Sequence, residues 1–253
     1  MSTNNRTGRK RDYVGVLSSV FAIVIGLLVG FVILLICNPS QALPGFVTIL
    51  TGAFTHGLKG VGQVFYYATP IILTGLSVGF AFKTGLFNIG TPGQFIVGAF
   101  AAVYVGIMWT GLGRIQWAVA LLAAILGGAL WGMVPGFLKA CFNVNEVIAS
   151  IMMNYIGMYM VNWIVKSYKP LFNNLRNESR NVAATAQIPK MGMDKLFPES
   201  SVGGGILLAI AAVLIIWVIL NKTTFGYELK AVGFNRDASR YAGINEKRNI
   251  IMS

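Results

Sequence analysis

Charged residues are scarce in this sequence of 253 residues: Asp, Glu, Lys and Arg make up 11% of it, whereas 55% is hydrophobic. A typical soluble domain is about 25% charged. Acidic residues and histidine are scarcer still, with 8 Asp and Glu and 1 His. A chain of this composition must present much of its surface to a medium other than water, which excludes an ordinary soluble domain.

Several signatures of catalysis are missing. The sequence has no GxxxxGK[ST] phosphate loop, no HExxH and no cysteine pair at zinc spacing. His56 has no Cys or His neighbour, and Cys37 and Cys141 stand alone. We therefore expect no metal site, no cofactor bound by this chain and no enzymatic activity.

The net charge of +12 does not indicate nucleic-acid binding, because the basic residues form no single patch. They lie in the segments between apolar runs, which is typical of topology signals in membrane proteins.

Long windows contain no charged residue at all, among them 13–58, 60–82, 115–138 and 200–221. A helix needs about 20 apolar residues to cross the roughly 30 Å hydrocarbon core of a bilayer. The windows predict an all-α fold, a polytopic transmembrane helix bundle in a single domain. The expected helices are 14–37, 61–82, 93–110, 115–138, 146–166 and 204–220.

One apolar stretch, 42–58, is interrupted by Pro44, Gly45, Gly52 and Gly57. The sequence leaves open whether it is interfacial, re-entrant or spanning.

The distribution of Lys and Arg favours a cytoplasmic N-terminus, because short basic connections tend to stay inside. This orientation makes 167–203 an external loop and 221–248 a cytoplasmic segment. The latter is rich in charge yet keeps apolar residues that a solvated linker would not need. Residues 249–253 look like the start of a further apolar helix, so we expect a chain truncated at its C-terminus.

Glycines recur at every fourth position of the helix expected at 115–138, as Gly128, Gly132 and Gly136. Small residues on one face let membrane helices approach closely, so these three predict helix packing. The pairs Gly75/Gly79 and Gly26/Gly30 repeat the spacing.

Polar residues form a stripe on the helix expected at 146–166: Ser150, Asn154 and Asn162 follow Glu146 at steps of four or eight. Asparagine facing lipid is costly, so the stripe should face protein or a water-filled path. Two interpretations remain, interhelical hydrogen bonding or the lining of a translocation pathway.

Residues 87–95 combine Pro and Gly with polar groups that include Asn88 and Gln94. Irregular backbone at membrane depth is tolerated where it lines a cavity, which makes both residues pathway candidates. Alternatively the stretch is a cytoplasmic turn, with Thr91 capping the next helix and Pro92 at its first position.

Three stretches together resemble the permease subunits of ABC importers for simple sugars and nucleosides. They are GLFNIGTPGQF at 85–95, NEVIASIMMNYI at 145–156 and GYELKAVGFNRDASRYAGI at 226–244. The resemblance implies a type II ABC importer permease, a pore-forming subunit of a bacterial cell membrane that has no ATPase of its own.

The resemblance also implies partners. These would be an ATP-binding subunit that carries the ATP, a second permease subunit, an extracellular substrate-binding lipoprotein and the lipid bilayer. Leu229, Val232 and Tyr241 would pack in a groove of the ATP-binding subunit, and Lys230, Arg236 and Arg240 would contact its rim. The full set expected in ATPase coupling is Gly226, Leu229, Lys230, Val232, Gly233, Asn235, Arg236, Arg240, Tyr241 and Gly243.

The alternative is an ion-coupled secondary transporter or a channel. Ion-coupled carriers place charged residues deep in their helices, and here none lies at mid-membrane, which counts against proton coupling.

Overall fold

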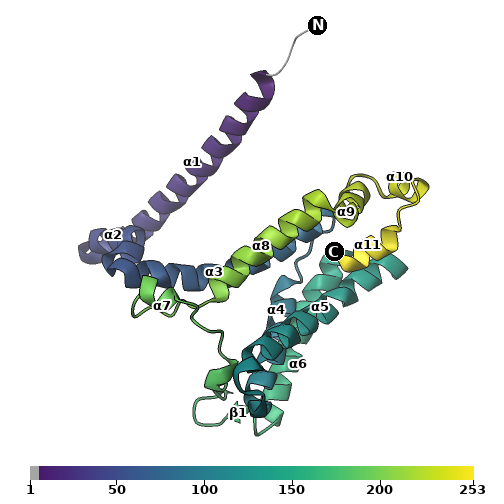
Figure 1. The fold of residues 1–253 in the computed structure, drawn as a ribbon. Coiled ribbons are helices and arrows are strands. Elements are labelled where there is room, and N and C mark those ends of the chain that lie inside the picture. Colours follow the sequence, from purple (N-terminus) through teal and green to yellow (C-terminus); the bar gives the residue numbers. More distant parts are fainter. Residues whose placement is uncertain (1–5) are drawn as a thin grey trace. The chain divides into compact units, whose positions relative to one another are not determined.

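The chain is helical over most of its length (Figure 1). The structure is a computed structural model that describes residues 6–253, with side chains from Gly15 onward; the side chains of the basic N-terminal residues fall outside this range. Within it, the strands are β1 (Phe172–Asn173) and β2 (Glu178–Ser179), which pair antiparallel with Phe172 opposite Ser179. The predicted all-α fold is confirmed.

Six helices in the described part are long and apolar enough to cross a membrane. Many of their large apolar side chains, such as Phe21, Leu126 and Leu214, are exposed, as is suitable for contact with lipid. The prediction of a polytopic helical membrane protein is confirmed. The helices are α1 (Arg6–Cys37), α3 (Gly57–Lys83), α4 (Thr91–Met108), α5 (Gln116–Phe142), α6 (Glu146–Ser167) and α8 (Gly205–Lys222).

Helix α5 continues four residues beyond the expected end at 138. The sequence boundary was placed at the first charge, Lys139, but a charged residue does not end a helix. The helix ends at Asn143, which has a positive φ of 52°. There the Asn143 amide donates to the Lys139 carbonyl and the Val144 amide to the Leu138 carbonyl, satisfying the last carbonyls of the helix.

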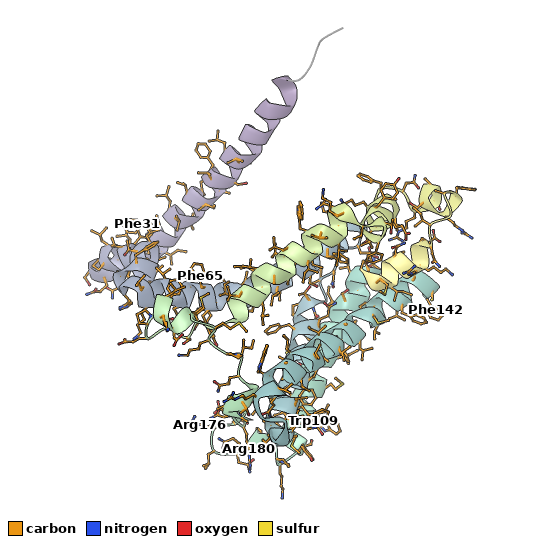
Figure 2. The ribbon with its side chains drawn as sticks, viewed as in Figure 1. Phe31, Phe65, Trp109, Phe142, Arg176 and Arg180 are labelled. Carbon is orange, nitrogen blue, oxygen red and sulfur yellow. The ribbon has the colours of Figure 1, made fainter. Side chains whose placement is uncertain are left out.

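The chain divides into two compact units, one ending at Val61 and the other covering Gly62–Ser253. The first contains α1 and α2 (Pro39–Thr55), joined by the rings of Phe31 and Phe46, whose centroids lie 4.8 Å apart (Phe31 is labelled in Figure 2). The 42–58 stretch is thus helical to Thr55 despite Pro44. Helix α2 has 17 residues, so at about 1.5 Å per residue its length is less than the roughly 30 Å thickness of the hydrocarbon core.

In the second unit α4 packs against both α5 and α6 through glycines. A Cβ atom on Gly98 would lie 2.9 Å from the Ala124 carbonyl oxygen, and one on Gly127 would lie 3.1 Å from the Ala101 Cβ. Gly157 of α6 similarly accommodates the indole of Trp131. Close helix contact therefore depends on the missing side chains.

The glycine pairs Gly26/Gly30 and Gly75/Gly79 behave differently, because a Cβ atom on any of them would meet nothing within 4 Å. Within their own compact units these pairs therefore face no partner helix, because equal spacing in sequence does not place one opposite.

The charged segment 221–248 folds into helices rather than a linker. They are α9 (Thr224–Phe234), α10 (Arg236–Tyr241) and the start of α11 (Glu246–Met252). Side-chain oxygens of Thr223, Asn235 and Asn245 cap them in turn. Apolar side chains of the charged segment join a core formed by residues distant in sequence. This core consists of Leu86, Val232 and Ile250, with Ala140 and Ile244 packed against them.

The 167–203 loop is fastened to the ends of α4 and α5 that the 3₁₀ helix Thr110–Ile115 connects. The fully buried Gln116 donates to the carbonyls of Val105 and Gly106, at 3.2 and 3.1 Å, and accepts from Thr185 in the loop. In the same loop the Arg180 side chain donates to the Phe172 carbonyl (Arg180 is labelled in Figure 2). The remaining elements are the 3₁₀ turn Ala184–Ala186 and α7 (Met193–Leu196).

We predict that Gly98→Ala destabilises the protein by about 1–3 kcal/mol, because the new methyl group overpacks the α4–α5 contact. The midpoint of thermal unfolding of the purified protein in detergent would measure this. The matched change Gly79→Ala, on an open helix face, should leave that midpoint unchanged. Equal loss in both variants would contradict the packing role of Gly98.

Candidate functional site

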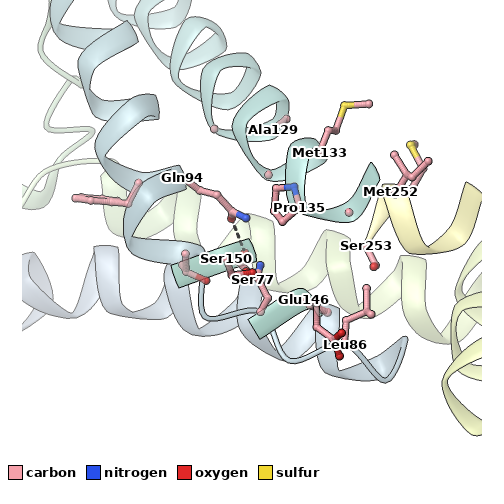
Figure 3. A pocket seen from close by; sticks show the side chains of 18 of the residues that line it. Ser77, Leu86, Gln94, Ala129, Met133, Pro135, Glu146, Ser150, Met252 and Ser253 are labelled. Atoms are coloured by element: carbon pink, nitrogen blue, oxygen red, sulfur yellow. Dashed lines mark hydrogen bonds between the residues drawn. The ribbon is translucent and has the colours of Figure 1, made fainter. Parts of the chain in front are cut away.

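A cavity of about 650 Å³ lies among α3, α4, α5, α6 and α11 (Figure 3). Three of the predicted pathway residues line it, Asn88, Gln94 and Ser150. The three predicted packing glycines of α5, Gly128, Gly132 and Gly136, line it as well. Its volume falls in the range of roughly 300–1,000 Å³ that is usual for small-molecule sites.

Gln94, in the first turn of α4, reaches toward α3 and α5. The Ser77 hydroxyl donates to its Oε1 across 3.5 Å, the dashed line in Figure 3. A Cβ atom on Gly132 would lie 2.8 Å from the Nε2 of Gln94. A Cβ atom on Gly128 would lie 3.4 Å from the backbone carbonyl oxygen of Gln94. Two of the three glycines thus make room for Gln94, while Gly136 contacts the backbone of Ile250 and Ile251 in α11.

Two hydroxyl groups beside Gln94 have no hydrogen-bond partner in the described part of the chain. Ser150 is 3% exposed, and the Oγ1 of Thr91 is buried without a partner. The interpretation that Thr91 caps α4 is wrong. Gly90 occupies the cap position without a side-chain bond, Thr91 is the first helical residue and Pro92 follows it.

Asn154 has a structural role instead. Its Nδ2 donates to the Ile89 carbonyl and its Oδ1 accepts from the Gly93 amide, both at 2.8 Å. These bonds fasten the non-helical connector before α4 to α6. For Asn154 the hydrogen-bonding interpretation of the polar stripe therefore holds, and the residue is not part of the cavity lining.

Asn162, the last residue of the stripe, is exposed on α6 and makes no hydrogen bond within the described residues. It does not line the cavity either. The structure therefore separates the five pathway candidates: Asn88, Gln94 and Ser150 at the cavity, Asn154 and Asn162 away from it.

The charged residues in the cavity lining are Lys139 and Glu146, which pair with each other across the α5–α6 turn. Their Nζ and Oε2 atoms lie 2.9 Å apart, and their side chains are 14% and 24% exposed. Because the two charges offset each other, the lining presents no net charge to a solute.

Several predicted coupling residues lie inside the chain. Leu229 and Val232 are 0% and 1% exposed. A Cβ atom on Gly233 would collide with the carbonyl oxygen of Lys83. A Cβ atom on Gly226 would collide with the carbonyl oxygen of Ile219. The expectation that Leu229 and Val232 pack in a partner's groove is therefore corrected, because both already pack in this chain's own core.

The other residues expected in ATPase coupling either stabilise the fold of the charged segment or are more exposed than Leu229 and Val232. Asn235 caps α10, Gly243 has a φ of +82°, and Lys230 donates to the Asn221 side chain. Arg236 is half-buried and Arg240 is exposed.

The aromatic residues of the charged segment supply its exposed apolar surface. Tyr241 is 94% exposed and Phe234 is 91% exposed. Phe234 is not among the residues that the sequence predicts for ATPase coupling. Its signal was available, a large apolar side chain in a charged segment, but nothing in the sequence separated it from Leu229.

Taken together, these features define a polytopic membrane protein in which a largely apolar cavity, with a few polar side chains and one ion pair in its lining, adjoins a charged helical segment. A family model described as the branched-chain amino acid transport system / permease component matches residues 60–253, a range that includes the whole second unit. The chain belongs to this family.

Among similar proteins, the guanosine ABC transporter permease protein NupP of Bacillus subtilis is 41% identical over 234 residues, 92% of this chain and 66% of the relative. The nucleoside ABC transporter permease protein NupB of Lactococcus lactis is 34% identical, and the match covers 99% of this chain and 68% of the relative. A glucose ABC transporter permease protein of Haloferax volcanii is 32% identical, and the match covers 79% of this chain and 53% of the relative. The chain thus spans about half to two thirds of the length of these relatives. No solved structure matches it significantly.

Replacing Asn154 with Leu should destabilise the protein by about 1–3 kcal/mol, because the Ile89 carbonyl and the Gly93 amide would lose their partner. Thermal unfolding in detergent would measure the loss, and limited proteolysis at residues 84–90 would locate it. Asn162→Leu is the matched control and should have little effect. A destabilisation of the same size in both variants would show that the two hydrogen bonds are not the cause.

Proposed function

We propose that the protein is the membrane-spanning permease subunit of an ABC importer for a nucleoside or simple sugar. The main support is the family match, which covers the unit containing both the cavity and the charged segment. The names of the relatives, guanosine, nucleoside and glucose permeases, support this solute class. ATP would be bound and hydrolysed by a separate subunit.

In this proposal the cavity is part of the solute pathway. Asn88, Gln94 and Ser150 supply amide and hydroxyl groups, and the offset charges of Lys139 and Glu146 leave the lining neutral. A neutral polar lining suits a small uncharged solute, whose polar groups need hydrogen-bond partners when they leave water.

The ATP-binding subunit would dock on the outer face of α9 and α10. Phe234 at the end of α9 and Tyr241 at the end of α10 are both exposed, as is Arg240 next to Tyr241, and large exposed aromatic side chains are frequent anchors of protein interfaces. Leu229, Val232 and Gly233 would act from inside by holding the segment against the α3–α4 connector.

We further propose that the N-terminus is cytoplasmic, in a bacterial cell membrane. Lys83 and Lys139 lie near the end where the charged segment packs, which fits the excess of basic residues on the cytoplasmic side. The 167–203 loop would then face outside and meet a substrate-binding lipoprotein, and a second permease subunit would complete the pathway.

The docking proposal predicts that Phe234→Asp and Tyr241→Asp each reduce co-purification of the ATP-binding subunit at least tenfold. A charge in place of a buried aromatic anchor typically costs 2 kcal/mol or more, about a thirtyfold change in affinity. Leu175→Asp, at a 97% exposed apolar residue of the 167–203 loop, is the matched control and should leave association intact.

Scrambling the whole of 226–244 would be a weaker experiment, since it would also disrupt the core around Leu229 and Val232. Full association after both surface substitutions would refute docking through this face.

A further inference from the structure

The amide of Gln94 offers the cavity both a donor and an acceptor from one side chain. Its Nε2 donates to no acceptor in the described part of the chain, and its Oε1 receives only the 3.5 Å bond from Ser77. The end of the Gln94 side chain packs against Gly132 of α5, where a Cβ atom would come within 2.8 Å of Nε2. Ser150, almost fully buried and without a hydrogen bond, lies close by (Figure 3).

We propose that this cavity binds the nucleobase of the solute and that Gln94 determines specificity by reading the edge of the base. The inference rests on the proposed transport function and makes it narrower, since it selects nucleosides over simple sugars. A carboxamide presents a donor and an acceptor side by side, and this pair matches a base edge that carries the complementary pair.

The walls of the cavity favour a planar ring. Phe87 and Phe95 both line it, and stacking a base on an aromatic side chain contributes about 1–3 kcal/mol. The rest of the lining is mostly aliphatic or glycine, which would favour burial of an aromatic base over a polyol.

The remaining polar side chains suit a sugar poorly, because several are already engaged within the chain. The Thr74 hydroxyl donates to the Pro70 carbonyl, and the Asn88 Oδ1 accepts from the Gly90 amide. A sugar carries hydroxyl groups around its whole ring, and each one buried without a partner would cost free energy. A base has its hydrogen-bonding groups in the plane of the ring, and both of its faces can be buried against apolar side chains.

The pairing of the two charges in the lining also disfavours solutes that carry a phosphate group. Lys139 is held 2.9 Å from Glu146, so no unpaired cation in the lining is available for a phosphate group. The site therefore takes a nucleoside rather than a nucleotide.

Photolabelling of the purified full-length chain with 8-azidoguanosine tests the proposal without ATP or partner subunits. We expect saturable labelling of peptides that contain residues 87–95 or 128–133. Guanosine should compete, whereas ribose and guanosine monophosphate should compete at least tenfold more weakly. Gln94→Leu should weaken labelling about tenfold, as expected from losing one bidentate pair.

Two further variants keep the result interpretable. Gln94→Glu retains the shape of the side chain but loses the Nε2 donor, and it should also weaken labelling. Gln41→Leu makes the same chemical change on an exposed residue of α2, outside the cavity, and should leave labelling unchanged. Labelling elsewhere, equal competition by ribose, or full labelling of both Gln94 variants would overturn the proposal.

ATP-dependent uptake of guanosine into vesicles with the assembled transporter tests the proposed function separately. Uptake without competitive labelling of the cavity would refute the base-binding site alone. Labelling of the cavity without ATP-dependent uptake would support the site and refute the importer.

Discussion

The contact on which the second unit most depends is the packing of the charged segment onto the ends of the membrane helices. Val232 of α9 meets Leu86 of the α3–α4 connector and Ile250 of α11 in one buried cluster, and Gly233 lies directly against the Lys83 backbone. Lipid provides no hydrophobic driving force between helices, whereas a segment that leaves the bilayer can bury apolar side chains away from water. Leu86 and Ile250 also line the cavity, so the cluster joins the proposed docking surface to the proposed solute pathway.

Within the helix bundle the structure relies on small residues and a few polar bonds. Gly98, Gly127 and Gly157 allow α4, α5 and α6 to approach, and Asn154 satisfies the Ile89 carbonyl of the connector and the Gly93 amide in the first turn of α4. Polar backbone at membrane depth must find partners inside the protein, and Asn154 supplies them here.

The polar stripe of α6 shows where sequence reasoning reached its limit. Ser150, Asn154 and Asn162 are spaced by multiples of four, yet one lines the cavity, one binds the connector and one is exposed. With 3.6 residues per turn, each step of four rotates a residue by about 40°, so Asn162 lies about 120° around the helix from Ser150. The same limit applies to glycine: Gly132 and Gly79 belong to equally regular patterns, but only Gly132 has a side chain opposite it.

The sequence by itself determined the membrane-spanning helical class, because charge-free runs of 20 or more residues have no stable alternative to helices in lipid. It also indicated a structured role for the charged segment, because apolar residues at helical spacing must be buried against something. Only the tertiary structure decided what buries them: Leu229 and Val232 face the chain's own core, while Phe234 and Tyr241 remain exposed. Amphipathic periodicity specifies that a face is covered, but the identity of the covering surface depends on contacts between residues far apart in the chain.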